Sequence, residues 1–304
     1  MAALDWQKVA MRDIIFAHTR YVYPSYTDYR RLVELAGFET CFVDQIDFTR
    51  KNVVYIVSPL NGEYRPHRDN WRKHAHNAHV VWWSLERPGP SGIAEFVRGT
   101  KRLLDDWYFD EVWLSDRYLC EQCHDKRVRF VVLGSHPALG QPRRSRRRSF
   151  QYDIVHLSYL TPRRQAIIDP LTNSLDVAPN GWGEARDRIL AASAFMLNVH
   201  QDDWLVLEPL RFALAAAWAL PMISEHMIDP YPYNRGETGH YIKQVHYDDL
   251  VGEVLNAVRG DYEQFRAMGR RMHDLMTTEF GFRRQVELAV AVLDRRPLDP
   301  LTLR

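Results

Sequence analysis

Nearly continuous apolar runs alternate with helical patterns through the first 135 residues of the chain. The apolar runs fall at residues 13–19, 52–60, 79–86, 110–116 and 128–135. Between them, residues 26–37 and 91–108 carry apolar side chains at helical spacing, and Gly37 ends the first of these helices. Strands that are apolar on both faces and alternate with helices predict parallel βαβ units in a doubly wound sheet.

The pattern stops at residues 141–150, a polar and basic stretch without periodicity, and then starts again. The second series predicts strands at residues 152–160, 174–179, 195–200, 221–225 and 241–247. Its helices are expected at 161–171 and 184–193, from Pro209 onward, and at 248–260, 262–280 and 283–294. The restart predicts an α/β fold with two Rossmann-like domains. These are an N-terminal domain (1–140) and a C-terminal domain (151–280), with a basic linker (141–150) between them and a last helix and tail (281–304).

The helix that begins near residue 208 opens with charged residues and continues with small apolar ones, LEPLRFALAAAWALP. Glu208 falls at the N-cap and Pro209 at the first helical position, where the missing N–H has no cost. A helix N-terminus presents unpaired N–H groups and the positive end of the macrodipole, which suits an anion such as phosphate. Arg211 lies one turn along on the same face and can add a bidentate contact. The structural alternative is a surface ion pair between Glu208 and Arg211.

Two predicted strands, 195–200 and 221–225, flank this helix. Their carboxyl ends place His200 and Glu225 at the same rim as Glu208. Ligands of open α/β sheets bind outside the carboxyl ends of the strands, so donors for a diphosphate would meet carboxylates for sugar or ribose hydroxyls. The arrangement predicts a phosphorylated ligand rich in hydroxyl groups.

Several stretches resemble known glycosyltransferases. EPLRFALAAAWALPMIS resembles the donor-site helix of the group-1 glycosyltransferases, in which Glu-Pro is followed by a second Glu and by Ala-Cys-Gly-x-Pro. YDIVHLSYLTPRRQAIIDPL and DVAPNGWGEARDRILAASAFMLNVH are similar to the spore-maturation (CgeB-like) glycosyltransferases. Those enzymes carry a Tyr-Asp strand, an Arg-Arg helix, Gly-x-Trp and Leu-Asn-x-His in this order. VVWWSLERP resembles the Trp-rich strand of their N-terminal half, so the resemblance covers roughly residues 80 to 290.

The resemblance implies a GT-B fold: two Rossmann-like domains with parallel sheets facing a central cleft, and a C-terminal helix that crosses back. It implies a hexosyltransferase-like enzyme that moves a sugar from a nucleoside-diphosphate sugar, such as a UDP-sugar, to an acceptor hydroxyl with retention of configuration. No metal and no other cofactor is expected. The N-terminal domain would hold the acceptor. The C-terminal domain would hold the donor through Trp182, Gly183, His200, Glu208, Leu210, Arg211 and Glu225.

The donor helix departs from the related pattern where the second glutamate is expected. Ala216 stands eight residues after Glu208, and alignment on Pro221 places Leu214 there instead. Either Glu208 or Glu225 substitutes for the missing carboxylate, or the site has lost its activity. The alternative function is that of a non-catalytic GT-B relative that binds a nucleotide or scaffolds partners.

Three side chains in the N-terminal half are candidates for the catalytic group. His18 closes the first strand, where it would face the cleft and take a proton from an acceptor hydroxyl. A loop histidine with its hydrogen bonds satisfied is the alternative. Glu86 and Asp116 end two other strands of the same sheet and are the carboxylate candidates.

Five arginines in the basic linker, Arg143, Arg144, Arg146, Arg147 and Arg148, admit two interpretations. They form a solvated interdomain loop, or they contact the phosphates of a nucleic acid. The second would matter because some GT-B enzymes glycosylate modified bases in DNA. A saccharide or small-molecule acceptor is favoured over a nucleic acid.

Composition narrows the remaining classes. The chain has 304 residues, 46% hydrophobic and 26% charged, with a net charge of +1, so it has no overall field that would gather nucleic acid or anionic membrane. Its three cysteines argue against a disulfide framework. Neither the cysteines and histidine at 120–124 nor the histidines at 74, 76 and 79 complete a metal-ligand set. With no signal peptide and no membrane span in the sequence, we expect a cytoplasmic protein.

Overall fold

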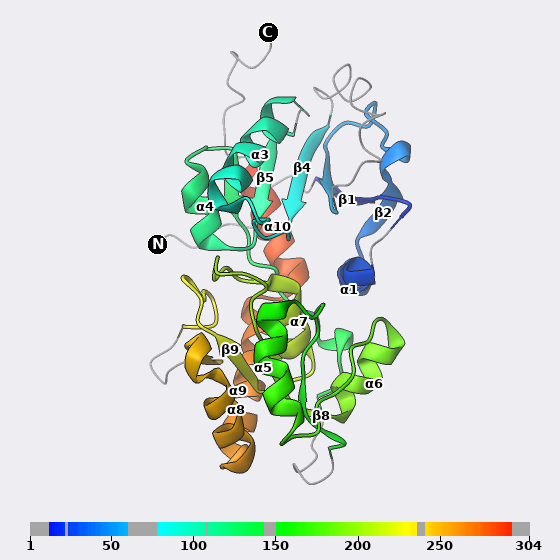
Figure 1. Cartoon of the computed structure of the whole chain (residues 1–304). Coiled ribbons are helices and arrows are strands. Elements are labelled where there is room, and N and C mark those ends of the chain that lie inside the picture. The colour runs from blue at the N-terminus through cyan, green and yellow to red at the C-terminus, as the bar shows by residue number, and fades with distance from the viewer. Residues whose placement is uncertain are drawn as a thin grey trace.

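The molecule is built on two β-sheets of parallel strands, which lie one above the other in Figure 1. The computed structural model describes residues 12–21, 24–59, 78–106, 109–142, 150–235 and 241–293. The N-terminal sheet has six strands in the order β2-β1-β3-β4-β5-β6, and every neighbouring pair is parallel. The strands are β1 (Asp13–His18), β2 (Glu39–Phe42), β3 (Val53–Val57), β4 (His79–Ser84), β5 (Glu111–Leu114) and β6 (Val128–Phe130).

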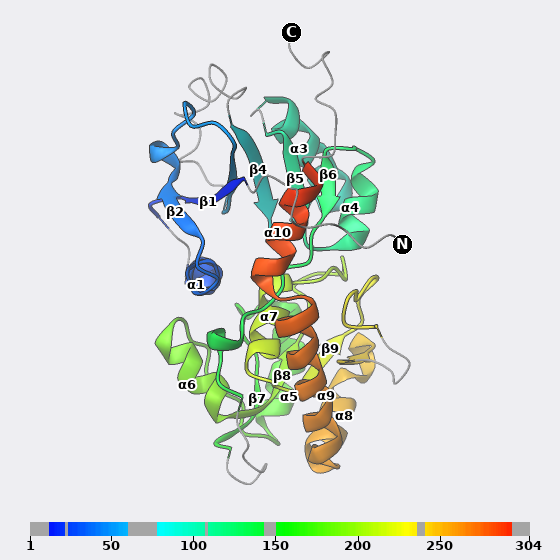
Figure 2. The same cartoon turned by 180° about the vertical axis from the view of Figure 1, so that it is seen from behind.

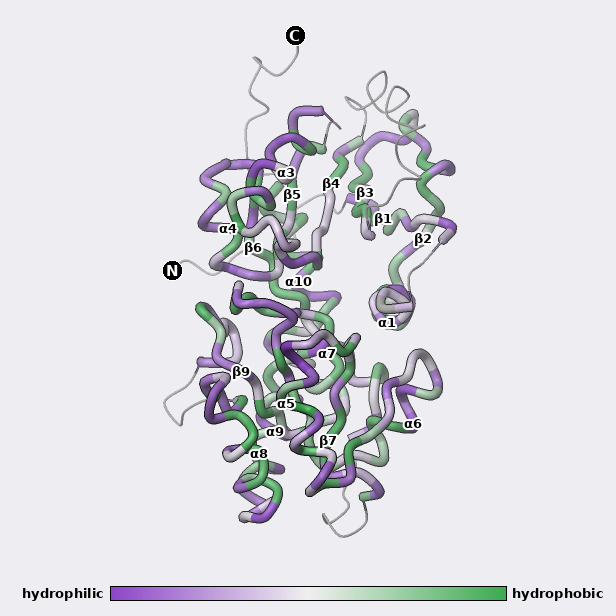
Figure 3. Tube along the Cα trace, viewed as in Figure 1, coloured by the Kyte–Doolittle hydropathy of each residue, from purple (hydrophilic) through white to green (hydrophobic). Residues whose placement is uncertain are grey.

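Helices cover both faces of this sheet, which explains why its inner strands, such as β3 and β4, are almost entirely apolar. Along β3, Val54 and Ile56 belong to one apolar cluster, whereas Val53 and Val57 belong to another. Successive side chains of a strand point to opposite faces, so the two clusters mark the two faces. Figure 3 shows hydrophilic and hydrophobic segments alternating along α3, as expected for a helix with one face in the core. The covering helices are α3 (Gly92–Asp106) and α4 (Arg117–Cys123) on one face and α1 (Thr27–Leu35) on the other.

The C-terminal sheet has four strands in the order β10-β9-β8-β7, again all parallel. Its strands are β7 (Tyr152–Val155), β8 (Ser193–Asn198), β9 (Met222–Glu225) and β10 (Lys243–Val245). Its helices are α5 (Pro162–Thr172), α6 (Glu184–Ala192), α7 (Pro209–Ala217), α8 (Leu250–Arg259) and α9 (Tyr262–Asp274). The predicted fold, with two Rossmann-like units and parallel sheets, is confirmed.

The last helix, α10 (Phe282–Leu293), returns to the N-terminal sheet, as Figure 2 shows. It follows α9 through a short π-helix, η8 (Leu275–Glu279). Phe282 stacks on Trp83 of β4 with the ring centroids 5.6 Å apart, and Arg129 donates to the Ala289 carbonyl at 3.0 Å. The returning chain passes close to the outgoing one: a Cβ on Gly134 would lie 1.9 Å from the Phe280 carbonyl oxygen, so only glycine fits there. The predicted crossover is confirmed.

The structure differs from the expected elements at four places. The edge strand β2 and the short helix α4 were not predicted, because β2 is partly exposed and α4 is only seven residues long. Residues 174–179 form a single bridge, Ile154 to Val177, instead of a strand. The strand expected over 128–135 ends at Phe130, because the apolar residues 131–133 are buried between the domains, in the cluster that also contains α7.

Four short 3-10 turns complete the described structure: η2 (Pro24–Tyr26), η3 (Val43–Gln45), η5 (Pro137–Leu139) and η7 (Tyr247–Asp249). Across the described part of the chain, no helix has both the length and the hydrophobicity needed to cross a membrane.

Candidate functional site

A cleft of about 330 Å³ lies between the two domains. It opens past the carboxyl end of β4 on one side, and past β7, β8 and the N-terminus of α7 on the other, which is where ligands of open parallel sheets bind. Most of its charged side chains are basic, so the cleft attracts anions. These charged side chains are Arg87, Arg164, Arg186, Arg211, Glu86 and Glu208.

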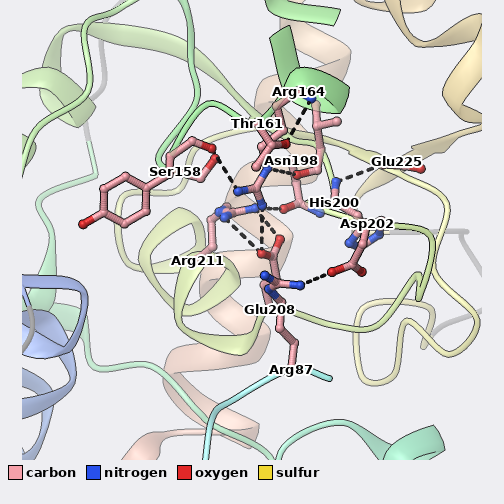
Figure 4. Close-up of polar contacts among 12 residues, drawn as sticks. Arg87, Ser158, Thr161, Arg164, Asn198, His200, Asp202, Glu208, Arg211 and Glu225 are labelled. Atoms are coloured by element: carbon pink, nitrogen blue, oxygen red, sulfur yellow. Dashed lines mark hydrogen bonds and ion pairs between the residues drawn. The ribbon is translucent and has the colours of Figure 1, made fainter. Parts of the chain in front are cut away.

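Glu208 is the carboxylate at the centre of this charge cluster (Figure 4). It occupies the N-cap of α7 with Pro209 at the first position, as the sequence predicts, but its side chain makes no capping hydrogen bond. Its carboxylate accepts hydrogen bonds from Arg164 at 3.1 Å and from Arg211 at 3.2 Å. Burial raises the pKa of Glu208, but the neighbouring guanidinium groups outweigh burial and hold the pKa below its usual value. Glu208 is therefore ionised at neutral pH.

Arg164 is the most deeply buried of the four arginines, with 2% of its side chain exposed. It sits in the first turn of α5, behind the N-cap Thr161, and donates to the carbonyls of Val199 at 2.9 Å and Tyr159 at 3.1 Å. Burial lowers its pKa to about 10, against the opposing effect of Glu208. Sequence reasoning did not single out Arg164, although the Arg-Arg pair that opens this helix is part of the resemblance.

Arg211 faces Glu208 from the next turn of α7 and also donates to the side chain of Asn198, at the end of β8. Its Nε is buried and has no acceptor among the described residues. An anion entering the cleft would give this donor a partner, and buried donors without partners are costly. Arg211 is therefore suited to bind an incoming phosphate.

The loop before α6 brings an aromatic surface to the cleft. Gly183 is the N-cap of α6 with φ of +57°, a left-handed conformation that favours glycine. The Trp182 ring lies 5.9 Å from that of Tyr159, which is 67% exposed, and the Arg186 guanidinium lies 4.4 Å from the Trp182 ring centroid. The exposed Tyr159 ring and the half-buried Trp182 ring together offer a stacking surface for a planar group.

His200 and Glu225, two of the predicted donor residues, are buried beside the cleft and do not line it. Glu225 accepts a hydrogen bond from the His200 backbone N–H at 2.9 Å and from Arg163 at 2.7 Å. Burial lowers the pKa of His200. Of the predicted donor residues, Trp182, Glu208, Leu210 and Arg211 line the cleft, with Gly183 adjacent in the chain.

Only one of the three catalytic candidates, Glu86, lines the cleft, where it accepts a hydrogen bond from the Tyr26 hydroxyl. His18 is 3% exposed, its Nδ1 lies 3.1 Å from the Ser58 carbonyl oxygen, and burial lowers its pKa. Asp116 is 5% exposed and accepts hydrogen bonds from two backbone N–H groups. Neither His18 nor Asp116 lines the cleft, because the Ser58 carbonyl lies against His18 and the Leu207 backbone N–H of the other domain reaches Asp116. Their catalytic roles stay predictions.

In the cleft wall, a leucine stands where the related donor helix carries its second glutamate. Leu214, which stands at the corresponding place when the helix is aligned on Pro221, lines the cleft, whereas Ala216 is fully buried. Among the described residues that line the cleft, Glu208 is thus the carboxylate that the C-terminal half supplies. Glu225, the other proposed substitute, is engaged by Arg163.

The remaining predictions concern the metal and the linker. The five linker arginines and the histidines at 74 and 76 lie outside the described residues. Within the described ranges, no three side chains of His, Cys, Asp or Glu are grouped so that they could hold a metal ion. Cys41, Cys120 and Cys123 are free thiols.

A buried histidine beneath the cluster should make stability depend on pH. His156 is 5% exposed, and burial, aided by Arg211 and Arg164, lowers its pKa from 6.5 to about 3. Below pH 6.5, His156 therefore binds a proton in the unfolded chain but stays neutral in the folded protein. The free energy of unfolding consequently falls as the pH drops below 6.5. When the pH is lowered from 6.5 to 5, the unsubstituted protein should lose about 2 kcal/mol of unfolding free energy through His156. The His156→Gln variant should not show this loss. Urea denaturation at the two pH values measures this, and parallel pH curves would contradict it.

No model of a known protein family matches the chain. Two curated proteins of Acanthamoeba polyphaga mimivirus are similar to it. The uncharacterized protein L140 is 30% identical over 146 residues, which is 41% of this chain and 47% of L140. The uncharacterized protein L138 is 29% identical over 115 residues, which is 36% of this chain and 13% of L138. The chain thus spans about half of one relative and a small part of the other.

Solved structures resemble the chain over most of its length. HepE from Anabaena, solved with UDP-glucose, has a TM-score of 0.62 at 9% identity, covering 93% of this chain and 99% of that one. The DNA-modifying enzyme β-glucosyltransferase has a TM-score of 0.52 at 10% identity, covering 91% and 98%. TarM has a TM-score of 0.56 at 9% identity, covering 83% and 56%. These likenesses show that the fold is of the GT-B type, and the narrower resemblance to the spore-maturation group stays a prediction.

Proposed function

We propose that the chain transfers a sugar from a nucleoside-diphosphate sugar to the hydroxyl group of an acceptor. The observation that carries this proposal is the group of arginines around Glu208, in a cleft at the carboxyl ends of strands from two parallel sheets. The GT-B fold supports it, because HepE, which shares that fold, was solved with UDP-glucose.

The cleft offers a partner for each part of such a donor. Arg211 and Arg164 would bind the diphosphate, which fits the planar fork of a guanidinium. The rings of Tyr159 and Trp182 would stack on the nucleobase, and the Glu208 carboxylate would accept hydrogen bonds from hydroxyl groups of the sugar. Positive charge fixed near the leaving diphosphate stabilises the transition state, so the arginines would serve in place of a metal ion.

On the opposite wall, Glu86 and Tyr26 would face the acceptor. A carboxylate within hydrogen-bond reach of the acceptor hydroxyl can take its proton during transfer. A saccharide or small-molecule acceptor is favoured, and contact between a nucleic acid and the linker arginines stays a prediction.

UDP should stabilise the protein against heat, because a ligand that binds only the folded state adds RT ln(1 + [L]/Kd) to its stability. Arg211→Ala should weaken UDP binding by about 1.5–3 kcal/mol, roughly 10- to 150-fold in Kd, since a charged hydrogen bond is lost. Isothermal titration calorimetry measures the affinity. Arg188→Ala is the control, because Arg188 is 75% exposed on α6 and does not line the cleft.

The alternative, a non-catalytic relative, is separated by a hydrolysis assay over several nucleotide sugars. UDP binding without turnover of any donor would indicate the non-catalytic function. If no nucleoside diphosphate shifts the melting temperature and no sugar donor is hydrolysed, sugar transfer is excluded and the non-catalytic function as a scaffold for partners is indicated.

A further inference from the structure

The segment that joins β8 to α7, residues 201–207, leaves its own domain and packs on the other one. Val206 is 3% exposed and lies in the apolar cluster that includes Leu114 and Leu119 of the N-terminal domain. Trp204 lies against Gly92, at the start of α3: a Cβ on Gly92 would be 2.7 Å from its ring. The 201–207 segment is therefore a bridge between the domains, and it ends where the cleft begins.

Polar contacts hold this segment on both sides. Arg87, beyond β4, forms an ion pair with Asp202 across the domains. The Ile228 N–H donates to the Leu205 carbonyl at 3.0 Å and ties the segment back to the C-terminal domain. Leu205 has φ of +50°, a left-handed conformation that a leucine keeps only where its surroundings impose it.

Asp116 makes the contact nearest to the cleft. One carboxylate oxygen accepts from the Leu119 N–H at 2.8 Å and caps α4, and the other accepts from the Leu207 N–H at 2.7 Å. Burial raises the pKa of Asp116 to about 6, and the two backbone N–H groups oppose that rise. A cap alone needs one oxygen, and a serine or asparagine supplies it equally well. The cap therefore does not account for the second oxygen, which accepts the Leu207 N–H.

Leu207 immediately precedes Glu208, which lies between Arg164 and Arg211 in the cleft. A backbone N–H fixed at residue 207 constrains the peptide plane from which Glu208 and the first turn of α7 start. We propose that Asp116 is a positioning residue: by accepting the Leu207 N–H it holds the 201–207 segment on the N-terminal domain and sets Glu208 in place for the donor. The effect on the donor rests on the proposed function, but the effect on the segment does not.

Two variants separate the positioning role from the capping role. Asp116→Asn and Asp116→Ser both keep an oxygen that caps α4 but lose the acceptor for Leu207. Hydrogen–deuterium exchange of the full chain should show residues 204–211 exchanging about tenfold faster in both variants, with α4 close to unchanged, since a hydrogen bond to a charged group is lost. Arg117→Gln is the matched control. It removes a different interdomain ion pair, with Asp229, and leaves Asp116 intact.

Exchange over 204–211 that stays as in the unsubstituted protein, or that rises equally in Arg117→Gln, would overturn the proposal. Exchange that rises over α4 instead would show that Asp116 is only a helix cap. UDP titration of the same variants should give a Kd raised about tenfold, because a displaced first turn misaligns the donor groups. If the unsubstituted protein binds no UDP, the proposed function fails, and the exchange result still decides the role of Asp116.

Discussion

Replacing Arg164 with methionine should lower the free energy of unfolding by about 3–5 kcal/mol, because it breaks a buried ion pair by removing one partner. Only 2% of the Arg164 side chain is exposed, so water cannot take over the hydrogen bonds that its guanidinium makes. Its loss would leave Glu208 with less of the positive charge that keeps it ionised, and the carbonyls of Val199 and Tyr159 without their donor. Methionine keeps much of the length of the side chain, so lost volume contributes little.

Urea denaturation followed by circular dichroism measures the effect. The control is Arg98→Met on α3, where the arginine is 65% exposed and pairs with Glu95 on the surface. Surface substitutions of this kind stay within about 0.5 kcal/mol. A loss below about 1 kcal/mol for Arg164→Met would mean that the buried pair contributes no more than a surface pair.

Asp28→Leu should destabilise the protein by a similar amount, about 3–5 kcal/mol, for a different reason. Asp28 on α1 forms an ion pair with Arg186 on α6, and the two side chains, from different domains, are 1% and 3% exposed. Burial lowers the pKa of Arg186 to about 10, which shows how poorly that charge is solvated. Removing Asp28 leaves the Arg186 guanidinium without its partner between the domains.

The double variant Asp28→Leu with Arg186→Met should recover most of the lost stability, because a buried ion pair replaced by apolar groups of similar volume is often close to neutral. Binding should behave differently. Arg186 lines the cleft, so UDP affinity should stay weak in the double variant although its fold is restored. A double variant as unstable as Asp28→Leu alone would show that the pair is not coupled in this way.

Local patterns were sufficient to predict the framework of the fold. An apolar strand such as β3 can be recognised from consecutive residues alone. The same holds for the Glu-Pro pair that opens α7. Arg87, Arg164 and Arg186 were not singled out, because an arginine looks alike in a sequence whether it lies in solvent or inside a cleft. Their partners are Asp202, Glu208 and Asp28, each far away along the chain.

The catalytic candidates show the same limit. His18, Glu86 and Asp116 all follow or end strands of one sheet, so the sequence presents them as equivalent. What separates them is the segment that covers each strand end. The Ser58 carbonyl lies against His18, and the 201–207 segment from the other domain reaches Asp116, whereas Glu86 stays open to the cleft. No local pattern records such long-range cover.

The return of α10 determines how this protein can be recombined with others of its fold. Phe282 contacts Phe16, Tyr29 and Trp83, so a helix from the end of the chain completes the core of the N-terminal sheet. A chimera that exchanged only residues 1–142 would place a foreign sheet against this α10. The unit that can be exchanged is therefore discontinuous, because a new N-terminal half has to bring its own counterpart of residues 282–293. Such a chimera needs two junctions, whereas a protein with consecutive domains needs one.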